Sequence, residues 1–170
     1  MFIIAYCSIR EEFMRFILIL ALTFSVNIFA KSMTAKVALN PMGSFEVKTK
    51  RIRGNVAKKG DALQAANIEI SVKSFDTDNE TRDEHLKDKL EVKKYPNIVV
   101  EKAVGKGGKG QAIIKMRNIS KKVPFSYSEK GSEVEVNFSI SLKDFGITGI
   151  NYMGVGVQDE VKISASLPVK

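Results

Sequence analysis

The sequence contains very few of the residues that build disulfides and metal sites. Its 170 residues include one Cys, one His and no Trp. A single Cys excludes a disulfide framework and a Cys-rich zinc site, and a single His excludes a metal site built from several histidines. The length fits one domain, with or without a targeting segment, and is too short for a (β/α)₈ barrel of roughly 250 residues.

Basic residues outnumber acidic ones by 27 to 19, which gives a formal charge of +8. They are spread along the chain in short groups such as Lys58–Lys59, Lys93–Lys94 and Lys121–Lys122, with acidic residues between them. Nucleic-acid-binding domains usually cluster their basic residues and add aromatic side chains that stack on bases. The pattern therefore favours a dispersed, solvated coat of charge. Weak attraction to anionic envelope surfaces is the alternative, and we expect no nucleic-acid partner.

The first 30 residues predict a secretory signal peptide. Of these residues 22 are hydrophobic, and an apolar run, Phe16–Phe24, lies between Arg15 and the small residue Ala30. A positive start, a short apolar run and a small residue at the cut are typical of such a peptide, whereas an uncleaved anchor needs roughly 20 apolar residues. We expect residues 1–30 to be removed. The remaining domain, residues 31–170, is then expected in the periplasm and not as an integral membrane protein.

The start of the chain allows a second interpretation. Glu11 and Glu12 place negative charge where a signal peptide prefers positive charge, and Met14 directly precedes a basic residue. Our hypothesis is that translation begins at Met14 and that residues 1–13 are a mis-assigned extension, which N-terminal sequencing of the precursor would test. Cys7 precedes the apolar run, so it is not placed as a lipoprotein cysteine. The mature chain then has no Cys, which suits an oxidising compartment.

Beyond residue 30 the hydrophobic pattern has a period of two. The clearest cases are residues 68–73, 134–140 and 161–169, and weaker ones are 45–47, 98–100, 114–116 and 123–125. Turn-forming residues separate them at 40–43, 59–61, 105–110 and 129–132. Strict alternation is typical of half-buried antiparallel strands, and about eight closely spaced strands predict a barrel or a sandwich.

One polar segment, residues 78–90, breaks this alternation and predicts a short helix. Asp78 or Asn79 can cap it, and Leu86 and Leu90 are four residues apart. Acidic residues come first and lysines later, which matches the helix dipole.

Two short motifs match enzyme signatures in letters alone. Residues 105–110 read Gly-Lys-Gly-Gly-Lys-Gly, but the alternating Ile114 and Met116 follow them, where a dinucleotide-binding loop needs a helix. Residues 144–146 read Asp-Phe-Gly, but no other kinase motif accompanies them. We interpret the first as a hairpin turn and the second as a structural corner. No nucleophile or metal constellation is visible, so no catalytic or metal-ligating residue is predicted.

A longer and more specific pattern spans residues 74–86 and 94–98. They read Ser-Phe-Asp-Thr-Asp-Asn-Glu-Thr-Arg-Asp-Glu-His-Leu and Lys-Tyr-Pro-Asn-Ile. This resembles the signature of the YceI-like family, in which S-x-x-T runs into N-x-x-R-D-x-H-L and Y-P-x-I follows a short helix. Asp144-Phe-Gly146, and Gly156 with Asp159-Glu-Val161, match further parts of the family pattern, so the resemblance covers residues 35–168.

The chain departs from the family pattern at two places. Asn118 stands where the family usually has Gly. The segment between Lys50 and Gly60 is short and more basic than usual, and it lacks the aromatic residue often found after the glycine that Gly54 matches. Because this region would border the cavity, the departures predict a change in ligand size or entry route.

The resemblance implies an all-β fold, an extended eight-stranded antiparallel lipocalin-like β-barrel with one short helix. It also implies a non-enzymatic protein, a monomer or homodimer, that binds a polyisoprenoid such as an isoprenoid quinone, or a fatty-acid-like lipid, and requires no other cofactor. An eight-stranded barrel either fills with side chains or holds one small ligand. A structural or stress-related envelope protein with a filled barrel is therefore the first alternative, and an enzyme acting on a lipid is the second.

Inward-facing apolar residues of these strands supply the predicted ligand contacts. The predicted lining is Phe45, Val47, Ile68, Ile70, Val72, Ile98, Val100, Ile114, Met116, Phe125, Val136, Phe138, Ile140, Ile163 and Leu167, with Phe75, Leu86 and Tyr152 closing the ends. Arg82, Asp83 and His85 form the densest polar cluster. We expect them to order the cavity mouth, either by capping and ion pairing or by contact with a ligand head group.

Overall fold

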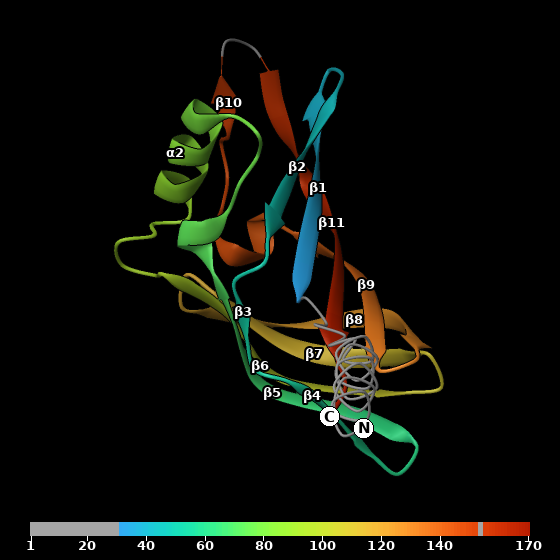
Figure 1. Ribbon diagram of the computed structural model, residues 1–170. Coiled ribbons are helices and arrows are strands. Elements are labelled where there is room, and N and C mark those ends of the chain that lie inside the picture. Colours follow the sequence, from blue (N-terminus) through green and yellow to red (C-terminus); the bar gives the residue numbers. More distant parts are fainter. Residues whose placement is uncertain (1–30, 153–154) are drawn as a thin grey trace, which may run out of the picture.

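The structure, a computed structural model, describes residues 31–152 and 155–170 (Figure 1), so the predicted signal peptide and alternative start lie outside the described residues. Eight strands have six residues or more: β1 (Ser32–Asn40), β2 (Ser44–Thr49), β5 (Ala62–Ser71), β6 (Asn97–Lys106), β7 (Lys109–Met116), β8 (Ile119–Lys130), β9 (Glu133–Ser141) and β11 (Val155–Pro168). The shorter strands are β3 (Ile52–Arg53), β4 (Val56–Lys59) and β10 (Asn151–Tyr152). The helices are the 3₁₀-helices η1 (Val72–Ser74) and η2 (Lys143–Phe145) and the α-helix α2 (Glu80–Lys89).

These strands form one antiparallel sheet that curls into a nearly closed barrel (Figure 1). Their order is β2-β1-β11-β9-β8-β7-β6-β5-β3, with β10 paired to β11 and β4 paired to β5. The all-β, lipocalin-like prediction is confirmed, and the short strands add to the expected eight long ones. No helix within the described residues has the length and apolar content to cross a membrane.

Backbone connections join the two ends of this strand order. β2 runs directly into β3 and β4, and both of these pair with β5. Lys48 exchanges two backbone hydrogen bonds with Asp76, at 2.8 and 3.0 Å. The Lys170 backbone N–H donates to the Val56 carbonyl at 2.9 Å. These bonds cover sheet edges that would otherwise present unpaired backbone groups.

Inward- and outward-facing residues alternate along the strands, as the period-two pattern predicted. On β9, Val134 and Ile140 are buried, whereas Asn137 and Ser139 between them are exposed. Across the strand pair, the inward-facing Phe138 lies opposite Ile163 of β11. A shift of one residue in register would turn every apolar side chain of the strand outward. The alternating pattern therefore determines the register of pairing as well as the presence of the strand.

The helix α2 begins where its capping pattern predicted. Asn79 is the N-cap, and its side-chain oxygen accepts a hydrogen bond from the Arg82 backbone N–H at 2.9 Å. No residue of α2 is fully buried, and Leu86 packs against the core. The helix therefore lies on the surface and presents one side to the barrel.

The predicted phase of the strand that ends near residue 73 needs a correction at Val72. Ile68 and Ile70 belong to β5, but Val72 opens the 3₁₀-helix η1. A 3₁₀ turn rotates successive side chains by about a third of a turn, so the alternation ends there. Val72 is 1 % exposed and lies in the packed core, not on the inner face of a strand.

The glycine-rich segment 105–110 forms the hairpin between β6 and β7, which confirms the turn interpretation. Gly107 and Gly108 have φ of 61° and 80°, a conformation that glycine adopts without strain. A Cβ at Gly110 would lie 2.3 Å from the Phe125 ring, and one at Gly105 would lie 2.6 Å from the Tyr127 ring. These flanking glycines therefore make room for two aromatic rings inside the barrel.

The Asp-Phe-Gly motif forms a structural corner after β9, as predicted. Phe145 is 1 % exposed, and Gly146 follows it with φ of 69°. Asp159 of β11 holds this corner with its carboxylate, which accepts hydrogen bonds from the Lys143 backbone N–H at 2.9 Å and the Ser141 hydroxyl at 2.8 Å. Two separate family-like motifs of the sequence thus meet in one place.

These hydrogen bonds make the stability of the corner depend on pH. The Lys143 backbone N–H, followed by the Ser141 hydroxyl, holds the pKa of Asp159 below its ordinary value. Because the folded pKa is lower than the unfolded value of about 3.9, the stabilisation is complete above that pH and is lost as the pH falls through the folded pKa. Between about pH 5 and pH 3, urea unfolding should show a larger loss of stability for the wild type than for Asp159→Asn.

The control is Asp144→Asn, which changes an exposed carboxylate of the same corner. It should leave the pH dependence of the wild type unchanged. If the free energy of unfolding falls equally with pH for the wild type and for Asp159→Asn, the stabilising role assigned to the Asp159 carboxylate is contradicted.

Candidate ligand-binding cavity

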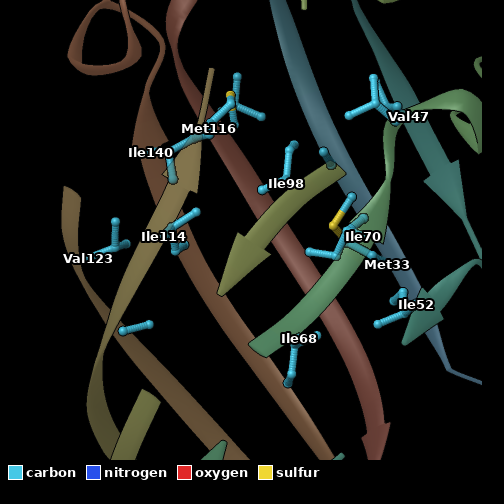
Figure 2. Packing of buried hydrophobic residues seen from close by; sticks show 14 of the residues in the cluster. Met33, Val47, Ile52, Ile68, Ile70, Ile98, Ile114, Met116, Val123 and Ile140 are labelled. Carbon is cyan, nitrogen blue, oxygen red and sulfur yellow. The ribbon is translucent and has the colours of Figure 1, made fainter. Parts of the chain in front are cut away.

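The barrel contains a cavity of about 1050 Å³. Voids in close-packed cores are few and seldom exceed the size of a water molecule, whereas ligand pockets occupy roughly 300–1,000 Å³. The side chains therefore leave the barrel unfilled. Figure 2 shows Ile70, Ile98 and Ile114, from three neighbouring strands, directed into the same interior, with Met33 of β1 nearby.

A second, smaller cavity of about 90 Å³ adjoins the first. Met33, Ile70, Val100, Ile114 and Phe138 line both cavities and so form the boundary between them. The inner space thus narrows at this ring of side chains. Beyond it, the smaller cavity reaches the two aromatic rings that pack against the hairpin glycines.

Polar groups line the large cavity at one end only. They come from α2 and its cap, from the β1–β2 turn and from β10, and they are Gly43, Ser44, Asn79, Thr81, Arg82, His85, Lys89 and Asn151. No Asp or Glu lines this cavity among the described residues. The mouth therefore offers hydrogen-bond donors and two cationic side chains, without a carboxylate that would repel an anionic or electron-rich group.

Arg82 is the best-placed of these cations. Its guanidinium lies over the Phe45 ring, 4.6 Å from the ring centre, and its side chain is half-buried. Within the described part of the chain, no carboxylate pairs with this guanidinium and no carbonyl accepts from it. The aromatic ring thus holds a cation at the cavity wall with its N–H donors still available, an arrangement that a partly desolvated guanidinium tolerates well.

Asp83 has a different role from its two neighbours in the predicted polar cluster. Its carboxylate accepts hydrogen bonds from the Thr77 backbone N–H at 2.9 Å and from the Thr77 hydroxyl at 2.7 Å. Thr77 is buried, so these bonds fix the entry into α2. Asp83 does not line the cavity, whereas Arg82 and His85 do. Of the two roles considered from the sequence, capping fits Asp83, and head-group contact stays a prediction for the others.

Most of the apolar residues predicted as lining do lie on a cavity wall. The large cavity is lined by Phe45, Val47, Ile70, Phe75, Leu86, Ile98, Val100, Ile114, Met116, Phe138, Ile140 and Ile163. The smaller cavity alone is lined by Ile68, Phe125, Val136 and Leu167. Val72 lies on neither wall, and the side chain of Tyr152 is outside the described residues. Whether these residues bind a ligand stays a prediction.

The sequence reasoning missed a large part of the wall. The apolar side chains of the large cavity that it did not name are Met33, Ala35, Val37 and Leu39 on β1, Leu142, Ile147 and Ile150 after β9, and Val155, Val157 and Val161 on β11, together with Leu90. The β1 residues alternate with polar ones, so a period-two signal for them was present. No such signal marks the irregular segment after β9.

Within the described ranges no three His, Cys, Asp or Glu side chains gather as a metal site would need.

An antiparallel barrel with an open apolar interior and polar groups at one end defines a lipocalin-like protein. The family model for the YceI-like domain matches residues 22–169, and the chain therefore belongs to the YceI-like family. Members of this family generally bind lipids rather than act as enzymes, and they are typically periplasmic.

The fold is also found in a solved structure. The chain is similar to BcnA of Burkholderia cenocepacia, known from a crystal structure, with a TM-score of 0.61 and 18% identity over 81% of this chain and 94% of that chain. At this identity the likeness concerns the fold alone. No curated protein matches the chain.

Proposed function

We propose that this protein binds one long-chain polyisoprenoid, such as an isoprenoid quinone, or a similar lipid, inside the barrel and performs no chemistry on it. The observation that carries the proposal is the 1050 Å³ cavity, which is apolar along its length and polar at one end. An amphiphile with a long chain and a small head group has the same division. We further propose that the protein stores, shields or transports this lipid in the periplasm, after export by the leader predicted over residues 1–30.

Burial of the chain supplies enough free energy for this function. Each methylene removed from water contributes about 0.8 kcal/mol, so ten of them contribute about 8 kcal/mol before the costs of binding. A net free energy of about 8 kcal/mol would correspond to a dissociation constant in the micromolar range, and each further buried methylene adds about 0.8 kcal/mol to offset the costs of binding. The lining therefore needs few polar contacts, and the lipid would be held chiefly by dispersion and exclusion of water.

The head group is proposed to lie beside α2. The polar side chains there can donate hydrogen bonds, and two of them, Arg82 and Lys89, are cations, so a head group that accepts hydrogen bonds is complementary. Quinone carbonyls, a carboxylate and a phosphate all meet this condition. The family's lipid ligands are consistent with such a group.

Extraction of the purified protein with organic solvent, followed by mass spectrometry, tests the proposal. We expect a long-chain lipid at close to one molecule per protein, and uptake of an added isoprenoid quinone by the delipidated protein. Repeated recovery of no lipid, together with no uptake of quinone, prenyl phosphate or fatty acid, would overturn it in favour of a structural barrel.

The head-group position gives a separate prediction. Arg82→Met removes the cation but keeps an apolar stem over the Phe45 ring, and it should weaken binding of an isoprenoid quinone or a fatty acid about tenfold, because a charge-assisted hydrogen bond is lost. Binding should be measured by fluorescence titration with each lipid and with a branched hydrocarbon that lacks a head group.

The matched control is Lys87→Met, on the same helix. Lys87 does not line the cavity and lies 3.8 Å from the Asp83 carboxylate. This variant should bind all three probes as the wild type does. If Arg82→Met weakens binding of the hydrocarbon as much as binding of the quinone, then Arg82 acts on the shape of the cavity, and the head group lies elsewhere.

A further inference from the structure

The strands β6, β7 and β8 are neighbours in the sheet (Figure 1), and lysines gather on their outer surface. The buried Ala112, Ile114 and Met116 point inward from β7, so the residues between them point outward. Five outward-facing lysines form a surface that we call the lysine face, and they are Lys102, Lys106, Lys109, Lys115 and Lys122. Lys130, which also points outward at the end of β8, pairs with Glu135 of β9 and is not included.

Strand pairing brings these lysines together. Lys106 lies opposite Lys109, and Ile113 lies between Lys102 and Lys122 in one row across the three strands. Two consecutive hairpins thus bring these five lysines onto one surface.

Few carboxylates neutralise this surface. Asp61 pairs with Lys106 at 3.1 Å, and Glu101 accepts a hydrogen bond from the Ser120 hydroxyl at 3.1 Å. Within the described ranges, no carboxylate pairs with the other four lysines. The Lys106 pair is itself fully solvated, so it contributes little and is easily exchanged for another partner.

The opposite half of the barrel has a different balance of positive and negative charge. The outward positions of β1, β2, β9 and β11 hold Lys36, Lys48 and Lys162 together with Glu46, Glu133, Glu135 and Glu160. Lys36 lies opposite Glu46, and Lys130 at the end of β8 pairs with Glu135 at 2.8 Å. Compared with these four strands, the lysine face therefore carries the excess of positive charge.

The lysine face also carries apolar side chains. Val104 is 39 % exposed and Ile113 is 37 % exposed, and the exposed Pro124 lies on the same surface. None of the outward positions of these three strands is aromatic. Nucleic-acid surfaces usually add aromatic rings for stacking, whereas lysines around small aliphatic groups suit the boundary between lipid head groups and acyl chains.

We propose that the lysine face docks on an anionic lipid surface. The ammonium groups would contact lipid phosphates while Val104 and Ile113 enter the upper part of the head-group layer, with the lysine stems alongside. Attraction over a Debye length of about 8–10 Å makes such docking reversible and dependent on salt. None of the five lysines lines either cavity, so docking and ligand binding can be tested separately.

Sedimentation with vesicles of phosphatidylglycerol and phosphatidylcholine tests this surface, with pure phosphatidylcholine vesicles as reference. The test variant is Lys102→Gln, Lys109→Gln and Lys122→Gln, and the matched control is Lys36→Gln, Lys48→Gln and Lys162→Gln on the opposite half. At low salt the test variant should bind the anionic vesicles about a hundredfold more weakly than the wild type, at about fivefold per lysine. The control, with the same net charge, should lose less than tenfold.

Two further measurements complete the test. Ile113→Ser, which keeps every lysine, should weaken vesicle binding severalfold and leave lipid uptake into the cavity unchanged. Equal losses for the two triple variants, no binding of the wild type to anionic vesicles, or tighter binding to duplex DNA than to vesicles would each overturn the proposal.

Discussion

Replacing Ile70 by Asp should abolish folding or lipid binding. Ile70 is 8 % exposed, points inward from β5 and lines both cavities. Its neighbours at the boundary between the cavities are all apolar, so an aspartate there has no partner for its charge. Burial of an unpaired charge costs about 4 kcal/mol or more, a large part of the roughly 5–15 kcal/mol that stabilises an ordinary domain. Circular dichroism during urea unfolding, with quinone uptake by the folded fraction, measures both effects.

The matched control places the same substitution on the other side of the wall. Ile113 points outward from β7 and is 37 % exposed, so Ile113→Asp should change the free energy of unfolding by only about 0.5 kcal/mol. Phe138→Glu, at the same inner boundary as Ile70, should behave like Ile70→Asp. If either inner variant folds and binds as the wild type does, the assignment of inner and outer faces is wrong.

Phe145→Ala should destabilise the protein by about 3–5 kcal/mol, the range for a fully buried aromatic ring. β8 pairs with β9 only from Ser126 to Lys130, and farther along the two strands separate. Phe145, at 1 % exposed, and Ile147, at 4 % exposed, pack against the core next to this interval. Removing the ring would leave a void where no strand pairing supports the wall.

Urea unfolding at neutral pH gives the stability change, and Asp144→Ala is the neighbouring control. Asp144 is exposed, so its truncation should cost less than about 0.5 kcal/mol. Phe145 does not line the large cavity, and the folded fraction of Phe145→Ala should therefore bind lipid with nearly unchanged affinity. A stability loss below about 1 kcal/mol would contradict the supporting role of the ring.

The sequence predicted the strands better than the features that lie between them. The alternation of apolar and polar residues identified β9 and β11, because each of these strands has one solvent-exposed side and one apolar side over many residues. It could not reveal that η1 turns Val72 away from the cavity wall. Nor could it reveal that Phe145 packs where β8 and β9 are not paired. Those outcomes depend on how the segments meet, and local periodicity contains no information on that point.

The distribution of charge on the folded surface was also difficult to predict from the sequence. Lys102 and Lys122 are 20 residues apart, and glycines and apolar residues separate the basic residues between them, so these basic residues do not form a compact run in the sequence. Two hairpins, with a bulge between Val100 and Lys102, align Lys102 and Lys122 with Ile113. Cavity volume is a similar case, because it is the space left after packing and varies with small differences among many side chains.

The pairing of β1 with β11 has a consequence for how the protein reaches its native state. The two strands at opposite ends of the described chain are neighbours over most of the length of β1, from Ser32–Ser166 to Asn40–Gly156. During synthesis β1 therefore has no partner on one side until β11 emerges. Pairings of such long sequence separation fold slowly, in milliseconds to seconds for comparable β proteins. The barrel can acquire its interior only after β11 is available, so for an interval the polypeptide is still unfolded and cannot enclose a lipid.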